Sequence, residues 1–305
     1  DKSPGLPYKL RGFKTKGDVI KDKIAISEVF QTWDRIGRGH NSTGLPDTCA
    51  FFRSQMCEPG VDKVRGVWGY PLTVIAEEYR FFQPYLEFLK TTDAPIAYRV
   101  EIATGGMAYI NEMCDQHPGG TYIMCDYKQF DKTIPPWLIR DAFQLVMDCF
   151  DMHHVRDSEG KVWPVDEEQS RKRFRTLVKY FINTPIRMAD GSRYRKSGGV
   201  PSGSTWTNII DTIVNCIVMR YICYNTTGYF PQAEMYLGDD SFLIAKGVVN
   251  LDDMADMALA DFGMIIHPDK RIATTNRMNI NFLGYHNRNG LPFKTNKFLI
   301  ASFIF

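Results

Sequence analysis

Three aspartates adjoin short apolar segments at two places far apart in the chain. Asp126 comes directly after the apolar run 122–125, and the adjacent pair Asp239 and Asp240 separates two further apolar runs. A carboxylate at the end of a buried strand costs free energy unless an opposite charge pairs with it, and adjacent carboxylates also repel each other. A bound divalent cation would relieve both costs. The three acids therefore predict a metal centre.

Mg²⁺ suits such a centre. It prefers oxygen ligands and usually keeps water and substrate phosphates in its coordination shell. Two such ions, about 3.5–4 Å apart, stabilise the attacking and the leaving oxygen of a phosphoryl transfer. The acids are thus typical of nucleotidyl transfer, with Mn²⁺ as a substitute ion. Taken singly, each has a simpler explanation, because Gly-Asp-Asp is a common turn sequence and Asp126 alone suits a turn or a helix entry.

A glycine-rich segment lies between the acids. Residues 197–203 contain three glycines, and glycine lets backbone N–H groups come close to a phosphate or a base. A long apolar helix is expected to begin near Ser204, and its N-terminus adds partial positive charge. Thr207 and Asp211, four residues apart, share one face of that helix, with Asn208 beside them. This polar helix start suits recognition of a sugar hydroxyl, and an ordinary capped helix after a loop is the alternative.

The elements that must hold these residues follow from the spacing of apolar side chains. Helices are expected at 74–89, from 135–136 to about 150, at about 168–181, from 204 to about 224 and at 251–262. Strands are expected at 121–125, 234–237 and 241–245, a hairpin at 186–194, and extended chain at 282–285 and from 293 onward. Residues 151–170 and the first sixty residues are expected to be turn-rich or loop-rich. This order predicts an α+β fold with a mainly antiparallel sheet.

Composition excludes several classes of protein. The 305 residues are 44% hydrophobic and 24% charged, an ordinary globular balance that excludes a disordered chain and allows two or three subdomains. A net charge of +2 excludes a histone-like nucleic-acid binder. The seven cysteines are odd in number and contain no CxxC pair, which indicates reduced thiols rather than disulfides or a zinc site.

The chain also lacks targeting signals. No apolar run reaches the length of about 18 residues that a membrane span needs, and no signal-peptide pattern opens the sequence. His153 and His154, beside Asp151, are expected in a loop, because adjacent histidines do not easily face one ion. The sequence ends abruptly on the apolar run 303–305, so a fragment of a longer protein is expected.

Three segments, in this order, resemble motifs A, B and C of viral RNA-dependent RNA polymerases. They are Asp126-Tyr-Lys-Gln-Phe-Asp131, residues 197–207 (Ser-Gly-Gly-Val-Pro-Ser-Gly-Ser-Thr-Trp-Thr) and Tyr236-Leu-Gly-Asp-Asp-Ser241. The chain looks most similar to the polymerases of small double-stranded RNA viruses, the partitivirus and picobirnavirus group. The opening residues 3–7 (Ser-Pro-Gly-Leu-Pro) and the segment 63–71 (Lys-Val-Arg-Gly-Val-Trp-Gly-Tyr-Pro) share that likeness. The resemblance covers nearly the whole chain.

The resemblance implies a right-hand polymerase with fingers, a palm built on an antiparallel sheet, and a thumb that is largely absent. The implied parts are fingers at 1–120, palm with motif A at 121–150, a fingers insertion at 151–196, palm with motifs B to E at 197–285, and the start of the thumb at 286–305. Motif D corresponds to 262–270 and motif E to 281–285.

The resemblance also implies roles for matching residues. Asp126 and Asp239 would bind the metal ions, with Asp240 as a weaker ligand. Lys270 would protonate the leaving pyrophosphate. Asp131 matches the residue that senses the ribose hydroxyls of the incoming nucleotide.

Further nucleotide-binding residues are implied around the glycine-rich segment and near the start of the chain. They are Lys63, Arg65, Ser202, Gly203, Thr207, Asn208 and Asp211. Lys63 and Arg65 match basic residues that hold the triphosphate. Position 211 is often Asn in this family, so whether Asn208, Asp211 or Asn215 supports ribose selection is left open.

The implied activity is templated RNA synthesis with two Mg²⁺ ions, serving viral genome replication and transcription. RNA template and product, ribonucleoside triphosphates and a viral capsid are the implied partners, with no membrane, and the implied location is the host cytoplasm, inside the virion. A reverse transcriptase-like polymerase is one rival, although such enzymes usually carry an aromatic residue where Asp131 stands and a different residue in place of Gly238. An inactive RNA-binding module is another, and the intact acids argue against it.

Overall fold

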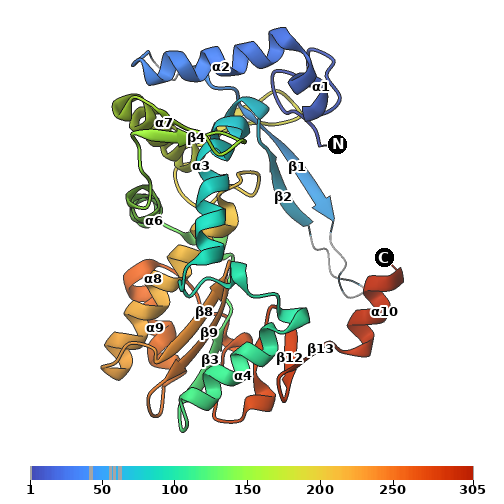
Figure 1. The fold of residues 1–305 in the computed structure, drawn as a ribbon. Coiled ribbons are helices and arrows are strands. Elements are labelled where there is room, and N and C mark those ends of the chain that lie inside the picture. The colour runs from blue at the N-terminus through green and yellow to red at the C-terminus, as the bar shows by residue number, and fades with distance from the viewer. Residues whose placement is uncertain (1, 41–43, 55–56, 58–59, 61–63, 305) are drawn as a thin grey trace. The chain divides into compact units, whose positions relative to one another are not determined.

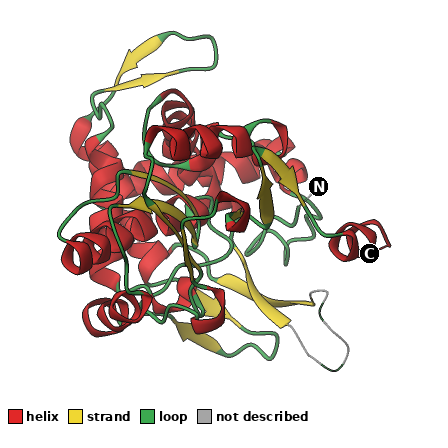
Figure 2. Cartoon of the chain, turned by 90° about the horizontal axis from the view of Figure 1, so that it is seen from below, coloured by secondary structure: helices red, strands yellow, loops and turns green. Residues whose placement is uncertain are grey.

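The computed structural model describes residues 2–40, 44–54, 57, 60 and 64–304. The chain forms two compact units, each made of two separate segments. The first unit comprises Asp1–Glu87 and Ile139–Thr207, and the second unit comprises Phe88–Leu138 and Asn208–Phe305. Both mix helices with largely antiparallel sheets (Figure 1, Figure 2), as the predicted α+β class requires. The boundaries proposed for fingers, palm and thumb stay predictions.

A four-stranded antiparallel sheet forms the centre of the second unit. Its strands are, in spatial order, β10 (Ile272–Thr274), β3 (Thr121–Cys125), β9 (Asp240–Ala245) and β8 (Ala233–Leu237). All five residues of β3 are buried, which explains why its residues 122–125 are all apolar rather than alternately apolar and polar. The three strands predicted around the acids are therefore present, and they pair with one another.

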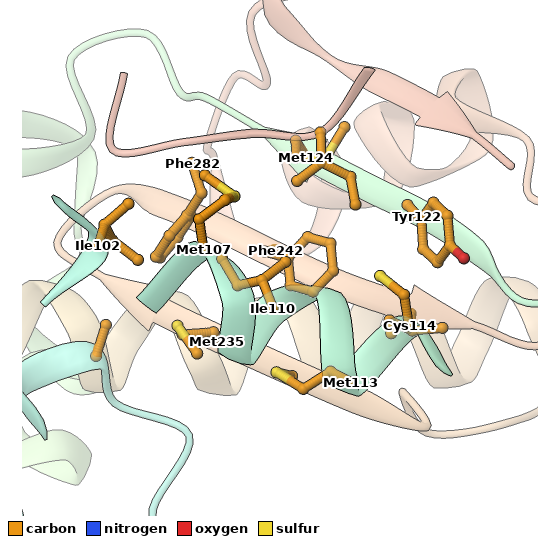
Figure 3. Packing of buried hydrophobic residues seen from close by; sticks show 13 residues of the cluster. Ile102, Met107, Ile110, Met113, Cys114, Tyr122, Met124, Met235, Phe242 and Phe282 are labelled. Carbon is orange, nitrogen blue, oxygen red and sulfur yellow. The ribbon is translucent and has the colours of Figure 1, made fainter. Parts of the chain in front are cut away.

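Helix α4 (Gly106–Gln116) packs on this sheet. Its buried residues Met107, Ile110 and Met113 recur at helical spacing and meet Tyr122 and Phe242 of the strands (Figure 3). The short 3₁₀ turns 97–99 and 102–104 precede the helix. This packing fixes the sheet whose edge carries the acids.

The second unit also contains further helices and a second sheet. They are the short helix α5 (Phe130–Thr133), the long helix α8 (Thr207–Thr227), α9 (Leu251–Phe262), and a three-stranded sheet of β11 (Asn281–Phe282), β12 (Tyr285–Arg288) and β13 (Leu291–Phe293), after which α10 (Asn296–Ile304) follows. Every residue from 209 to 215 in α8 is buried. Polar side chains in that stretch must therefore find partners inside the protein.

The first unit is mainly helical. It contains α1 (Lys16–Lys21), α2 (Lys23–Gly37), most of α3 (Leu72–Thr91) and α6 (Pro136–Asp148), α7 (Glu167–Ile182), a sheet in the order β2 (Val64–Gly69), β1 (Thr48–Ser54), β6 (Pro185–Arg187), β7 (Arg193–Arg195), and the hairpin β4 (His154–Arg156) with β5 (Val162–Pro164). Its core includes edge-to-face rings of Phe81, Phe143, Phe174 and Trp206, with centroids 5.2–6.2 Å apart.

The prediction of a loop-rich opening was wrong. Helices α1 and α2 occupy much of it, and both have side-chain caps. Thr15 and Asp18 form a reciprocal capping box at α1, and the Asp22 carboxylate accepts hydrogen bonds from the first turn of α2. The buried residues Val29 and Trp33 of α2 lie one helical turn apart, so an apolar face was present beneath the basic residues.

Two smaller expectations also need correction. The chain after residue 293 is not extended, because α10 forms at Asn296–Ile304, and the turn-rich stretch 151–170 contains the hairpin of β4 and β5. His154 Nδ1 lies 2.8 Å from Asp151 Oδ2. Cys49, Cys114, Cys125, Cys149, Cys216 and Cys223 form no disulfide with one another in the described part of the chain. None of the helices in the described parts of the chain is long and apolar enough to cross a bilayer.

Removal of the Phe242 ring should destabilise the second unit strongly. Phe242 is fully buried on β9, stacked near Tyr122 with ring centroids 6.4 Å apart. Phe242→Ala should lower the free energy of unfolding by about 3–5 kcal/mol in a urea titration, because it leaves a cavity. Phe303→Ala in α10, where the side chain is 92% exposed, is the control and should cost about 0.5 kcal/mol or less. Equal losses in the two variants would contradict this core assignment.

Candidate active site

The register of the central sheet brings the distant acids to one edge. Cys125, the last residue of β3, pairs with Ser241 of β9, and Leu237 of β8 pairs with Asp240. The Ser241 hydroxyl also donates to the Cys125 carbonyl at 3.3 Å. Asp126, directly after β3, and the 238–240 turn between β8 and β9 therefore lie at the same end of the sheet. The three acids, which the sequence analysis expected to lie together, are thus at the same end of the sheet.

The electrostatics of the turn reflect that crowding. Burial, and after it the charges of Asp239 and Asp126, raise the pKa of Asp240 to about 6, whereas Lys270 acts in the opposite direction. Carboxylates that shift one another in this way lie close enough to interact directly. Negative charge is thus concentrated at the edge of the sheet, in a partly desolvated place.

Lys270 supplies the nearest counter-charge. Its Nζ lies 2.5 Å from Asp126 Oδ2, and it belongs to the 3₁₀ turn Pro268–Lys270. The His267 N–H donates to the Asp126 carbonyl at 2.7 Å, so the backbone of this turn is tied to the end of β3. The lysine expected from motif D is therefore brought to the acid expected from motif A.

The three acids suit divalent metal ions by their chemistry. They offer only carboxylate oxygens, which Mg²⁺ and Mn²⁺ prefer, and a bound cation would relieve the repulsion that raises the pKa of Asp240. As they stand in the described part of the chain, no three His, Cys, Asp or Glu residues are grouped closely enough to hold an ion. The Lys270 ammonium pairs with Asp126 Oδ2 instead, so it would compete with a metal ion for that oxygen.

Asp131 and Asp211 form a second acidic pair beside the first. Asp131 lies in α5, which follows a left-handed residue, Gln129 (φ 53°), that bends the chain after β3. Burial raises the pKa of Asp211 well above its usual range, and the charges of Asp131 and Asp239 add to the effect. Asp211 Oδ1 is buried and has no hydrogen-bond partner among the described residues. The ribose-sensing candidates thus adjoin the metal-binding candidates.

The other candidates on α8 have different surroundings. Asn208 Oδ1 accepts a hydrogen bond of 2.5 Å from the Tyr98 hydroxyl, and its Nδ2 lies 3.1 Å from the place that a Cβ on Gly238 would occupy. Asn215 is fully buried, and its Nδ2 donates to the carbonyls of Gly238 and Asp240. The amide of Asn215 is therefore committed to the turn, whereas Asn208 and Asp211 lie beside the acids.

The glycine-rich segment belongs to the first unit, where its contacts differ from those expected. A Cβ on Gly203 would lie 1.8 Å from the Trp68 carbonyl of β2, so this glycine is needed for close packing of two backbones. The Ser202 hydroxyl accepts from the Trp68 N–H at 3.2 Å. The Thr207 hydroxyl donates to the carbonyls of Pro201 and Ser204. Helix α8 starts at Thr207, three residues later than predicted.

A buried carboxylate and a half-buried ammonium around this segment were not singled out in the sequence analysis. Glu78, on α3 and 1% exposed, accepts hydrogen bonds from the Ser204 hydroxyl and from the N–H and hydroxyl of Thr205 at 2.6–2.9 Å. Lys196 Nζ donates to the carbonyls of Ile182, Gly198 and Gly199 at 2.6–3.1 Å. The only signal in the sequence was an acid within an apolar helix and a lysine beside the glycines, which surface residues also produce.

The basic residues expected to hold the triphosphate are described only in part. Lys63 lies outside the described residues. The backbone of Arg65 belongs to β2, where its Cα pairs with that of Arg53. Their predicted role stays a prediction.

Comparisons with a protein-family model and with individual proteins point to the same family. The family described as viral RNA-dependent RNA polymerase matches residues 1–297. The RNA-directed RNA polymerase of Cryptosporidium parvum virus 1 is 30% identical over 249 residues, which cover 79% of this chain and 42% of that protein. The enzyme of the same name from Atkinsonella hypoxylon virus is 25% identical over 269 residues, covering 75% of this chain and 40% of that protein. This chain therefore spans about two-fifths of the length of these relatives.

The fold has a counterpart among solved structures. An insertion-loop deletion mutant of the RNA-dependent RNA polymerase of a human picobirnavirus superposes with a TM-score of 0.65 at 18% identity, over 81% of this chain and 47% of that one. The unmodified polymerase of a human picobirnavirus gives a TM-score of 0.63, also at 18% identity. At this identity the likeness concerns the fold.

The buried carboxyl of Glu78 should make stability depend on pH. Burial raises its pKa from 4.5 to about 7, so between these values the folded chain holds a proton that the unfolded chain has lost. Stability is therefore highest below about pH 4.5 on this account and falls as pH rises to about 7, by about 3 kcal/mol in all. Glu78→Gln should remove this slope from the free energy of unfolding measured across pH 4–8.

Glu87, exposed on the same helix, provides the control. Glu87→Gln should keep the wild-type dependence on pH. If Glu78→Gln and the wild type lost stability in parallel as pH rises, the raised pKa of Glu78 would be wrong.

Proposed function

The chain belongs to the family of viral RNA-dependent RNA polymerases, and from this premise we propose that it forms the fingers and palm of an enzyme that joins ribonucleotides on an RNA template. The observation that carries the proposal is the convergence of Asp126, Asp239 and Asp240 at one edge of a buried antiparallel sheet. We assign fingers to 1–120 and 151–196, palm to 121–150 and 197–285, and the start of a thumb to 286–305.

In the proposed mechanism Asp126 and Asp239, helped by Asp240, would hold two Mg²⁺ or Mn²⁺ ions. When bound, the ions would neutralise charge on the triphosphate and favour loss of the proton from the primer hydroxyl. The primer oxygen forms a bond to the α-phosphorus while the bond from that phosphorus to the pyrophosphate oxygen breaks. The protein contributes by positioning these groups and excluding alternative arrangements.

Lys270 has a double role in this proposal. Its ammonium neutralises Asp126 before the metal arrives, at 2.5 Å from the carboxylate. With Asp126 neutralised by bound metal instead, Lys270 would be free to approach the triphosphate. It can then give its proton to the departing pyrophosphate, which balances the proton lost by the primer hydroxyl.

Ribose recognition is proposed for Asp131 together with Asp211 and Asn208. The mutual influence of Asp131 and Asp211, and the closeness of Asn208 to Gly238, support this group. Asn215 is a poor candidate because its amide already donates to two carbonyls. A reverse transcriptase-like enzyme would instead extend primers with deoxyribonucleotides, so competition between the two nucleotide types on one RNA template separates the alternatives.

We also propose residues that hold the triphosphate, and the substrates, partner and location of the enzyme. Lys63 and Arg65 would hold the triphosphate, and Ser202, Gly203 and Thr207 would shape the adjacent loop. The substrates would be RNA template and product with ribonucleoside triphosphates, for genome replication and transcription. We also propose a capsid partner and a location inside the virion, in the host cytoplasm, as the resemblance to polymerases of double-stranded RNA viruses implies.

Loss of either principal acid should abolish synthesis. Asp126→Asn and Asp239→Asn, each in the full-length protein, should lower incorporation of labelled ribonucleotides on an RNA template by roughly 10³-fold or more, because the metal ligands are lost. Asp256→Asn, an exposed acid on α9, should leave incorporation unchanged. Normal synthesis by either active-site variant would sink the assignment. Mg²⁺-dependent RNA binding without any wild-type incorporation would favour an inactive RNA-binding module.

Lys270→Met should separate metal binding from chemistry. Removing the ammonium beside Asp126 should tighten Mn²⁺ binding, because the competing cation is gone, while turnover falls by about a hundredfold through loss of the proton donor. Mn²⁺ titration monitored by electron paramagnetic resonance and single-nucleotide incorporation measure the two effects. Lys246→Met, at an exposed position after β9, is the control. Weaker Mn²⁺ binding by Lys270→Met would contradict the proposed competition.

A further inference from the structure

The turn that carries Asp239 has little intrinsic means of holding one conformation. It joins β8 to β9 through Gly238 and Asp239, because Leu237 and Asp240 already pair with each other. Gly238 has a φ of 62°, as the first position of a tight hairpin turn allows only for glycine or a few polar residues. Glycine permits many conformations, and the adjacent carboxylates repel each other. Something outside the hairpin must therefore fix the turn.

Two side chains of α8 bind the backbone of this turn. The Gly238 N–H donates to Thr212 Oγ1 at 2.8 Å. The Asn215 Nδ2 donates to the Gly238 carbonyl at 3.0 Å and to the Asp240 carbonyl at 3.2 Å. Thr212 and Asn215 are three residues apart, so they share a helix face. Backbone groups of Gly238 and Asp240, the residues on both sides of Asp239, are thus held by one helix.

The polarity of this contact is fixed. The Thr212 hydroxyl donates its own hydrogen to the Asn208 carbonyl at 2.6 Å, which leaves its lone pair for the Gly238 N–H. The Asn215 amide must present nitrogen to the turn, because an oxygen there would face two carbonyl oxygens. Thr212 and Asn215 are each fully buried, so water does not compete for these bonds.

A cost accompanies the arrangement. Asn215 Oδ1 is buried and has no hydrogen-bond partner among the described residues. An unmade bond of this kind is expensive, and an apolar side chain of the same size would avoid the expense. Asn215 therefore lowers stability through its unpaired oxygen but donates to the carbonyls of Gly238 and Asp240. Its effect on the turn best explains its presence.

We infer that Thr212 and Asn215 are positioning residues that hold the Gly238–Asp240 backbone so that Asp239 and Asp240 point together toward the metal ions. The inference rests on the proposed function, because the turn is assigned to metal binding there. It also gives Asn215 a role different from ribose selection. Partners that orient a metal ligand typically affect metal affinity about 10–100-fold when removed.

The test compares Thr212→Val and Asn215→Leu, which keep side-chain shape but remove the hydrogen-bonding groups, in the full-length protein. Each should raise the dissociation constant for Mn²⁺, measured by electron paramagnetic resonance without RNA or nucleotides, by roughly 10–100-fold. Thr212→Ser keeps the hydroxyl and should restore wild-type affinity. Thr226→Val is the control, because the Thr226 hydroxyl donates only to carbonyls of its own helix.

Measurements are made well below the melting temperature of each variant, so that loss of folding does not imitate loss of metal. Wild-type Mn²⁺ affinity in folded Thr212→Val and Asn215→Leu would overturn the inference and leave the proposed function intact. Failure of the wild-type protein itself to bind Mn²⁺ would overturn both. If Asn215→Leu does not fold, the difference between Thr212→Val and Thr212→Ser still decides the question.

Discussion

Repulsion among carboxylates at one edge of a buried sheet is the constraint around which the second unit is organised. Asp126 leaves β3 and the 238–240 turn joins β8 to β9, and strand register puts both at the same end. Burial and neighbouring charge already raise the pKa of Asp240 to about 6. Such a concentration of charge persists in a folded chain only where opposite charge or fixed hydrogen bonds oppose it.

The structure opposes the repulsion in two ways. Lys270 places an ammonium on Asp126, and the backbone of its turn is bonded to the end of β3. Helix α8 holds the other side, through Thr212 and Asn215 on the backbone around Asp239. The buried core between α4 and the sheet, shown in Figure 3, holds together the strands β3, β8 and β9 beside which the acids lie. Charge balance and backbone positioning thus come from different elements.

Much of this could be predicted from the sequence, and the reasons are local. The segment 121–125 is short, mostly apolar and followed by an acid, and a strand formed there as expected. The segment 251–262 has a helical apolar pattern with Asn250 as its cap, and a helix formed there as expected. The helices α1, α2 and α4 were missed. Glycines flank α4, and basic residues hide the apolar face of α2.

The contacts that position the site could not be predicted in the same way. Glu78 and Ser204 are far apart in sequence, and so are Asn215 and Gly238, yet each pair is joined by hydrogen bonds inside the protein. A sequence pattern reports the burial of a helix face but not which backbone that face meets. Gly203 is an example, because the Trp68 carbonyl leaves no room for a Cβ at this position.

In the proposed mechanism, divalent metal ions replace the Lys270 ammonium as the counter-charge of the acids. Crystals of the full-length protein soaked in Mn²⁺ test it directly by anomalous diffraction. We expect anomalous peaks for Mn²⁺ ions that are bound by carboxylate oxygens of Asp126 and Asp239, with the Lys270 ammonium displaced from Asp126. Saturating Mn²⁺ with no peak at these acids, and Lys270 still paired with Asp126, would contradict it.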